Sequence, residues 1–354
     1  MVITDIEQLT PDWMTQALQR HGLSGEITAV ETEHLHGTWS KMYRIRPSYS
    51  VSNPDLPESF LLKICSGEHA VFGPSEVYYY TMDYANLPDA PIPRCYDGVY
   101  QSEPRGYHLL VEDLSATHKD TWEMPPTLER GKAVAEALAR LHAHYWGPDR
   151  IESIGEKIPG ALEIGRYVGH NKQGLHPLFD TMGDALPPDW RQVLEDVFAY
   201  HPAAMLARTR RPAGFTIVHG DVNSGNILAP IDGGDGRIYL IDRQPFDWSL
   251  TCWLGAADLA YMMVEWWDTE MRREHEMTVL RHYQSCLEAL GAEYPWGLLV
   301  NDYRLSAVKS LQGAVEWCVL EEDRNDKRWV WEPKLHKAMA AYFDLDCAEI
   351  MQIR

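Results

Sequence analysis

Two short segments carry the strongest signal in this sequence: Ile217-Val218-His219-Gly220-Asp221-Val222-Asn223-Ser224-Gly225-Asn226-Ile227-Leu228 and, soon after, Ile238-Tyr239-Leu240-Ile241-Asp242-Arg243-Gln244. Each contains a short apolar run typical of a buried strand. The turn-rich stretch 232–236 between them predicts a hairpin loop. Three polar side chains, Asp221, Asn226 and Asp242, therefore stand at strand edges, where they can converge on one point.

These three side chains have the chemistry that phosphoryl transfer needs. One carboxylate can orient or deprotonate the attacking hydroxyl, and the amide and second carboxylate offer hard oxygen ligands to Mg2+ on nucleotide phosphates. The spacing from Asp221 to Asn226 matches the kinase catalytic loop, in which four residues separate Asp from Asn. The alternative is that Asp221 and Asn226 are turn residues and Asp242 caps a strand end, for purely local reasons.

The two segments resemble the aminoglycoside phosphotransferase and choline kinase-like superfamily of small-molecule kinases. The likeness is closest to its ecdysteroid-kinase-like (CHK kinase-like) branch, which typically shows His-Gly-Asp, a short spacer, Asn, and then Ile-Asp-Phe-Gln. This chain has Arg243 where the branch usually carries an aromatic residue. The departure concerns the packing beside the metal site and not the metal ligand itself.

The resemblance implies a two-lobed, protein-kinase-like α+β fold. A small N-lobe with an antiparallel, nucleotide-binding sheet is expected over residues 1–115, and a larger, mainly helical C-lobe with the catalytic loop and substrate site over 116–354. Asp221 is then the catalytic base, and Asn226 and Asp242 hold Mg2+. The phosphoryl donor is ATP or GTP.

Two further residues are expected to support the catalytic loop. His219 is interpreted as orienting the loop through hydrogen bonds; a metal site built on it would need a third His or Cys at ligand spacing, and the sequence has none there. Asp258 resembles the family aspartate that braces the loop backbone. The alternative is an acid at a helix N-terminus, which is favourable there on electrostatic grounds.

Lys63 stands inside an apolar strand, Phe60-Leu61-Leu62-Lys63-Ile64, where a buried lysine is costly unless it is paired. Glu76 lies on the helical stretch that follows. A strand lysine paired with a helix glutamate is the kinase device for holding nucleotide phosphates. The alternative is an edge-strand lysine that points to solvent. By resemblance, Ser40 belongs to the loop over the phosphates, and Glu112 and Leu114 to the segment that binds adenine; from the residues alone, the first is equally a plain hairpin.

Tryptophans and acids crowd the region after Asp242. Asp247, Trp248, Glu265 and Trp266 form a candidate substrate site, because aromatic faces beside carboxylates can hold an ammonium group. The alternative is ordinary core packing, since aromatic residues at helical spacing usually belong to the core.

Composition limits the classes of partner. The chain has 354 residues, 24% of them charged, with a formal net charge of -20. A phosphate-backbone ligand needs clustered Lys and Arg, so no nucleic-acid partner is expected. No apolar run is long enough to span a bilayer, and no basic region with an apolar core opens the chain. The six scattered cysteines indicate reduced thiols in the cytoplasm.

The periodicity predicts a helix that starts at Thr10-Pro11, runs through Leu18 and ends near His21-Gly22. Further helices are expected at 128–146, 190–207, 255–261, 272–291, 302–317 and 332–354. We therefore expect a phosphotransferase that phosphorylates the hydroxyl of a small molecule. Choline, another amino alcohol or an aminoglycoside is the more specific alternative for the acceptor. A kinase-fold binding module and a metal hydrolase are the rivals from other classes.

Overall fold

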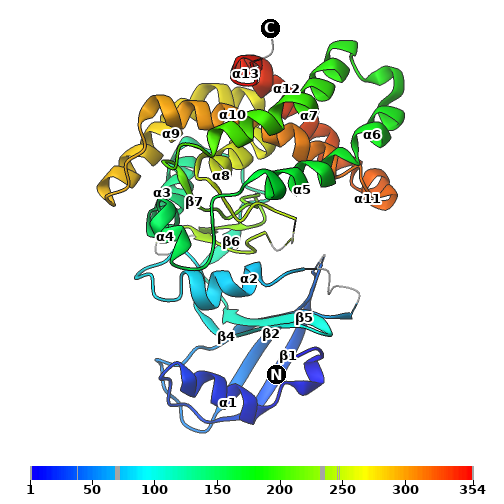
Figure 1. The fold of residues 1–354 in the computed structure, drawn as a ribbon. Coiled ribbons are helices and arrows are strands. Elements are labelled where there is room, and N and C mark those ends of the chain that lie inside the picture. Colours follow the sequence, from blue (N-terminus) through cyan, green and yellow to red (C-terminus); the bar gives the residue numbers. More distant parts are fainter. Residues whose placement is uncertain are drawn as a thin grey trace. The chain divides into compact units, whose positions relative to one another are not determined.

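The structure, a computed structural model, describes residues 2–37, 39–67, 72–231, 236–244, 246 and 248–352. The chain forms two compact units (Figure 1). The first comprises Met1–Lys119 and Leu228–Asp247, and the second comprises Asp120–Ile227 and Trp248–Arg354. The class is α+β, as predicted: the N-terminal part holds an antiparallel sheet and the C-terminal part is mainly helical.

The first unit is organised around a five-stranded antiparallel sheet in the order β1-β2-β3-β5-β4. Its strands are β1 (Ile27–Leu35), β2 (Lys41–Tyr49), β3 (Phe60–Cys65), β4 (Cys95–Ser102) and β5 (Arg105–Glu112). Helix α1 (Pro11–Arg20) packs on this sheet, with Met14 and Leu18 buried against Phe60, Leu62 and Ile64. The alternation of β3, which sends every second side chain to one face, explains this core.

The predicted start of α1 is confirmed, because Thr10 Oγ1 accepts a hydrogen bond from Trp13 N at 3.1 Å. The first unit also contains the short helix η1 (Ile6–Gln8), helix α2 (Ser75–Tyr78) and the π-helical turn η3 (Tyr79–Asp83). Helix α2 carries Glu76, as the sequence predicted.

A second, three-stranded sheet explains why residues 228–247 belong to the first unit. It consists of β6 (His118–Asp120), β8 (Ile227–Pro230) and β9 (Tyr239–Leu240), in the order β6-β8-β9. Ile231 N donates to Thr117 O, and Leu240 N donates to Pro91 O. The sequence placed one boundary near Ser115 and everything after it in the helical part. In the structure the first unit extends to Lys119 and also includes residues 228–247. These residues belong to it because β8 and β9 form one sheet with β6. Residues 232–235 of the expected hairpin loop lie outside the described residues.

The second unit is built mainly from helices around α10 (Trp296–Glu316), which packs against α12, α9, α8, α7 and α5. Its helices are α3 (Leu128–His144), α4 (Pro148–Glu152), α5 (Ala161–Lys172), α6 (Leu175–Met182), η4 (Gly183–Ala185), α7 (Pro188–Arg208), α8 (Ala256–Ala260), the π-helical turn η5 (Tyr261–Trp266), α9 (Thr269–Ala289), α10, α11 (Glu321–Asp326), α12 (Arg328–Asp344) and α13 (Cys347–Ile350). Strands β7 (Phe215–Ile217) and β10 (Cys252–Leu254) form a two-stranded antiparallel sheet.

Helices α5 and α6 were not predicted. Gly165 and Gly169 lower the helix propensity of α5, and Pro177 interrupts the pattern of α6. Burial overrides these weak local preferences: Ile164 and Leu178 are both buried. Within the described ranges, no helix is both long and apolar enough to cross a membrane.

Candidate active site

The predicted catalytic loop leaves β7 in the second unit and is anchored by Asp258 of α8. Asp258 Oδ2 accepts a hydrogen bond from His219 N at 2.7 Å, and Oδ1 accepts one from Gly220 N at 2.8 Å. Gly220 has a φ of 81°, a left-handed conformation that favours glycine. Asp258 therefore holds two consecutive backbone amides of the loop immediately before Asp221.

His142 of α3 completes this anchor. Its Nε2 lies 3.0 Å from Asp258 Oδ2, and its Nδ1 lies 2.6 Å from the hydroxyl of Tyr283 on α9. Burial disfavours the charged form of Asp258, but His142, with His219 and the Gly220 amide, outweighs it and lowers the pKa of the carboxyl. Nothing in the local sequence around His142 indicates this role, because its partners lie more than a hundred residues away along the chain.

The carboxylate of Asp221 is held by three side-chain donors. Tyr261 Oη donates to Oδ1 at 2.7 Å, Asn223 Nδ2 donates to the same oxygen at 2.9 Å, and Asn226 Nδ2 donates to Oδ2 at 3.0 Å. Tyr261 belongs to η5, and desolvation together with the nearby Asp221 carboxylate raises the pKa of its hydroxyl well above the usual value, so it is a donor at neutral pH. Such charge-assisted bonds fix the direction of a carboxylate.

Asn223 also shapes the loop backbone. Its Oδ1 accepts hydrogen bonds from Gly225 N at 2.7 Å and Asn226 N at 3.2 Å, as in an Asx-turn. Asn226 Nδ2 donates to Asp221 O at 2.9 Å in addition to the carboxylate. Because the amide nitrogen of Asn226 is used in this way, its carbonyl oxygen is the atom suited to a metal ion. Asn223 was not predicted, although an Asn two residues before a glycine is a local signal that could have identified it.

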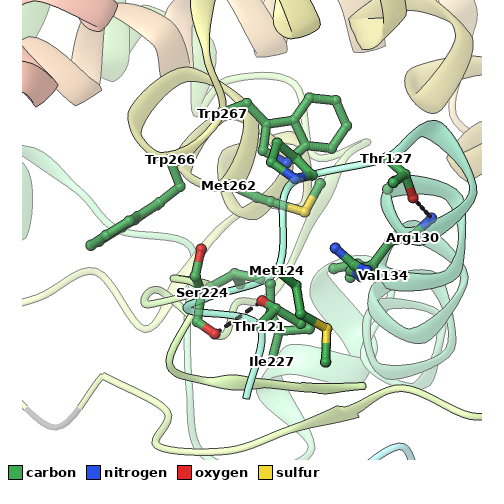
Figure 2. A pocket seen from close by; sticks show the side chains of 13 residues that line it. Thr121, Met124, Thr127, Arg130, Val134, Ser224, Ile227, Met262, Trp266 and Trp267 are labelled. Atoms are coloured by element: carbon green, nitrogen blue, oxygen red, sulfur yellow. Dashed lines mark hydrogen bonds between the residues drawn. The ribbon is translucent and has the colours of Figure 1, made fainter. Parts of the chain in front are cut away.

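The loop is also tied to the chain before α3. Thr121 donates to Ser224 O twice, from its backbone nitrogen at 2.9 Å and from Oγ1 at 3.0 Å. Figure 2 shows Thr121 and Ser224 beside a small cavity that Val134 of α3, Met262 of η5 and Trp267 also line. Its volume is about 30 Å3, so it holds a water molecule or two and no sugar or amino alcohol.

Lys63 and Glu76 form an ion pair in the first unit, as the sequence predicted. Lys63 Nζ lies 2.8 and 3.0 Å from the two Glu76 carboxylate oxygens and 2.9 Å from Asp242 Oδ1. Tyr107 Oη of β5 donates to Glu76 Oε2. The strand lysine is therefore paired, and the solvent-directed alternative is wrong.

Burial and ion pairing have opposite effects on the pKa values of Lys63 and Glu76. Burial lowers the pKa of Lys63, but the carboxylates of Asp242 and Glu76 outweigh it and raise the pKa. Burial raises the pKa of Glu76 to about 7, against the opposing effect of Lys63. The geometry favours the charged pair, because the ammonium group contacts both Glu76 oxygens and a tyrosine hydroxyl adds a further donor.

Asp242 has an unusual backbone conformation. Its φ of 58° is left-handed, which is uncommon for a residue other than glycine, and its side chain is 46% exposed. Such conformations persist where the surrounding structure enforces them. The next residue, Arg243, supplies that support: it is buried, pairs with Asp83 and lies over the Tyr79 ring with 5.9 Å from Cζ to the centroid. This packing replaces the aromatic residue expected at position 243.

The residues predicted to bind nucleotide lie at the ends of strands in the first unit or just beyond them. Ser40 is buried immediately before β2, and Glu112 ends β5. Glu112 N donates to Arg94 O at 2.8 Å, and Leu114 O accepts from the amides of Thr117 and His118. Binding of adenine by this segment stays a prediction. The convergence of the three catalytic-type side chains also stays a prediction, because Asp242 belongs to the first unit and Asp221 and Asn226 belong to the second.

The acid and tryptophan cluster predicted for the substrate separates into different environments. Asp247 lies outside the described residues. Trp248 stacks on His170 with 4.1 Å between ring centroids. Glu265 and Trp266 do lie together, and both contact Lys334 of α12, whose Nζ is 3.1 Å from Glu265 Oε2 and 4.4 Å from the Trp266 ring centroid.

Comparisons with known proteins show the family and the fold. The phosphotransferase enzyme family matches residues 45–296. A search of curated proteins found no match. Among solved structures, the fold is similar to choline kinase from Cryptosporidium parvum Iowa II, at 12% identity and a TM-score of 0.59, covering 91% of each chain.

Two other structures share the fold. The microcompartment-associated aminopropanol kinase is 10% identical with a TM-score of 0.54, covering 97% of this chain and 99% of that one. A mutant of the aminoglycoside 2'-phosphotransferase-IIIa, in its GDP complex, is 14% identical with a TM-score of 0.52, covering 94% and 99%. At these identities, the likeness extends to the fold alone.

Proposed function

The chain belongs to the phosphotransferase enzyme family and is a small-molecule phosphotransferase, and we propose that it transfers the terminal phosphoryl group of ATP or GTP to a hydroxyl group of its acceptor. The observation that carries this proposal is the orientation of the Asp221 carboxylate. Three side-chain donors hold this carboxylate, and Asp258 braces the loop on which it lies. A binding module would not need such a pre-oriented base.

In the proposed reaction, Asp221 orients the acceptor hydroxyl and takes its proton. The acceptor oxygen forms a bond to the terminal phosphorus, while the bond from that phosphorus to the bridging oxygen breaks and the nucleoside diphosphate leaves with the electron pair. Phosphoryl transfer of this kind depends mainly on positioning and on stabilising charge. The rigid hydrogen bonds to Asp221 serve the first of these needs.

Lys63, held by Glu76, is proposed to grip the nucleotide phosphates. The oxygens of Asn226 and Asp242 fit the hard donor set that Mg2+ prefers, and the ion would neutralise phosphate charge when bound. The contact between Lys63 and Asp242 supports the proposal, because it already places an ammonium group and a metal-type carboxylate 2.9 Å apart. Ser40, with the segment from Glu112 to Leu114, completes the proposed nucleotide site.

We further propose that the chain belongs to the ecdysteroid-kinase-like branch of the superfamily, on the pattern from His219 to Asn226. His219 is proposed to orient the loop: its Nδ1 accepts from Asp221 N at 3.3 Å. For the acceptor, the names of the similar structures include choline and aminopropanol kinases. The sequence-based hypothesis that Trp248, Glu265 and Trp266 bind an amine-bearing acceptor depends on whether Glu265 is available to a substrate.

The test is turnover by purified protein with a panel of sugars, aminoglycosides, amino alcohols and steroids, measured as release of ADP from ATP or GDP from GTP in the presence of Mg2+. With a true acceptor, Asp221→Asn should keep nucleotide affinity and lose turnover by at least about a hundredfold, since the base and its charge are removed while the phosphate clamp remains. Near-normal turnover of Asp221→Asn would remove Asp221 from the role of base, and nucleotide binding without turnover on any acceptor would favour a binding module.

A further inference from the structure

Lys334 is a buried cation enclosed by aromatic rings. It lies on α12 and is 3% exposed. Its Nζ is 4.4 Å from the ring centroid of Trp266, 5.0 Å from that of Tyr261 and 5.8 Å from that of Trp317. Glu265 Oε2 is 3.1 Å from the same nitrogen. We call these four side chains around Lys334 the ammonium cage.

The composition of the cage is that of a binding site for an alkylammonium ion. Aromatic faces attract a cation through the ring quadrupole, and a carboxylate supplies the opposite charge. A lysine is rarely buried, because removing its charge from water is costly unless the charge is paired. Lys334 thus occupies, as part of the chain, the position that a free ammonium ligand would take.

The cage is connected to the catalytic base. Lys334 Nζ lies 3.5 Å from Tyr261 Oη, and the same hydroxyl donates to Asp221 Oδ1 at 2.7 Å. Tyr261 therefore forms one wall of the cage and one of the three supports of Asp221. A ligand whose ammonium group entered the cage would place its remaining atoms near the base, unless the cage is already filled.

We propose that Lys334 is an internal ligand that fills the ammonium cage, so that the acceptor reaches Asp221 without an ammonium group bound by Glu265 and Trp266. This substrate class rests on the proposed function. A second cation beside Lys334 would be repelled by the Lys334 ammonium group, and the carboxylate of Glu265 is already paired with Lys334. The acceptor therefore carries an uncharged group on this side of its hydroxyl. This proposal replaces the amine-bearing acceptor that the sequence suggested for Glu265 and Trp266.

The first experiment tests the cage without using kinase activity. Lys334→Ala removes a propylammonium equivalent from the cage, so propylammonium chloride is the matched probe and propanol is the uncharged control. Titration calorimetry at constant ionic strength should show Lys334→Ala binding propylammonium at least about tenfold more tightly than the wild-type protein, as one cation–π contact or more would give. Propanol should not discriminate between the two proteins.

A neighbouring lysine provides the matched control. Lys337 lies one turn along α12, and its Nζ donates to the backbone oxygen of Trp266 at 3.2 Å. Lys337→Ala also removes a lysine from this helix but leaves Lys334 in the cage. It should bind propylammonium no better than the wild-type protein. Equal gains in both variants would show that the effect is general loss of positive charge and would overturn the cage.

Unpaired Glu265 can destabilise Lys334→Ala, so a second variant keeps the experiment decisive. Lys334→Ala combined with Glu265→Gln retains the three rings without a buried unpaired charge. It should still prefer propylammonium to propanol, with weaker affinity than Lys334→Ala where that variant folds, because the carboxylate is gone. If neither variant prefers the cation, the pair of Lys334 and Glu265 is structural only and the proposal is wrong.

The second experiment tests the substrate class and does depend on kinase activity. Choline and its uncharged tert-butyl isostere are compared as acceptors. The ratio of kcat/KM for choline to that for the isostere should rise at least about tenfold from the wild-type protein to Lys334→Ala. Propylammonium binding without this shift would retain the cage and overturn the substrate class, whereas no turnover on either acceptor or on the wider panel would count against the proposed function alone. A wild-type protein that prefers choline, with Glu265→Gln raising its KM, would also overturn the substrate class.

Discussion

Tyr261→Phe is the sharpest test of how Asp221, the proposed catalytic base, is held. The substitution removes one hydroxyl oxygen and keeps the ring that forms part of the ammonium cage. The hydroxyl donates to Asp221 Oδ1 at 2.7 Å, and a hydrogen bond to a charged group contributes about 1.5–3 kcal/mol. If the contribution is used to position the base in the transition state, kcat falls about tenfold to a hundredfold, since 1.4 kcal/mol corresponds to a factor of ten.

The assay separates positioning from general destabilisation. Steady-state kinetics with a true acceptor should show the loss in kcat, while nucleotide affinity, measured by titration, stays unchanged because Lys63 and its partners are untouched. The matched control is Tyr303→Phe, which likewise removes a tyrosine hydroxyl that donates to a carboxylate, here Glu276 Oε2 at 2.8 Å. It should lower the melting temperature without lowering kcat.

The result that refutes the reasoning is specific. If Tyr261→Phe and Tyr303→Phe lose similar stability and both keep kcat within about twofold of the wild-type protein, a factor worth about 0.4 kcal/mol, the hydrogen bond to Asp221 is structural. In that case Asn223 and Asn226 alone suffice to orient the carboxylate. A fall in kcat for both variants would mean that kcat reports stability and not the position of the base.

Three further expectations concern the proposed metal carboxylate, the loop brace and a buried histidine. Asp242→Ala should abolish Mg2+-dependent turnover while circular dichroism stays unchanged; activity at ordinary Mg2+ concentration would exclude Asp242 as a ligand. Asp258→Asn should lower kcat about tenfold or more and the free energy of unfolding by about 1–3 kcal/mol, because an amide nitrogen then faces a backbone N–H of His219 or Gly220; unchanged urea unfolding and kinetics would contradict the brace. Burial lowers the pKa of His201 from 6.5 to about 4 in the folded protein, so the unfolded chain takes up the proton first and stability is lost as the pH falls from 6.5 to 4, by up to about 3 kcal/mol. Urea unfolding at pH 7 and pH 4.5 should show a smaller loss for His201→Gln, and equal losses would show that other groups carry the pH dependence.

Local patterns in the sequence determined the parts of the site that depend on neighbours along the chain. The spacing from Asp221 to Asn226 fits one loop, and the capping bond of Thr10 forms within one helical turn. Lys63 inside an apolar strand had to find a carboxylate, because an unpaired buried charge is too costly. Such features follow from strand and helix periodicity and from desolvation, so they can be inferred before the fold is known.

Only the tertiary structure decided which distant residues complete the site. His142, Tyr261 and Lys334 come from different helices, and their roles depend on packing that no local period encodes. Residues 228–247 joined the first unit because backbone groups of β8 and β9 needed strand partners, whatever their order in the chain.

Lys334 shows the physical reason most clearly. A single lysine on a helix is usually solvated, and its sequence position carries no sign of burial. The free energy that keeps it inside comes from Glu265 and from three aromatic rings supplied by other elements. Ion pairing and cation–π attraction act over a few ångströms, so they stabilise buried Lys334 only once the helices have packed.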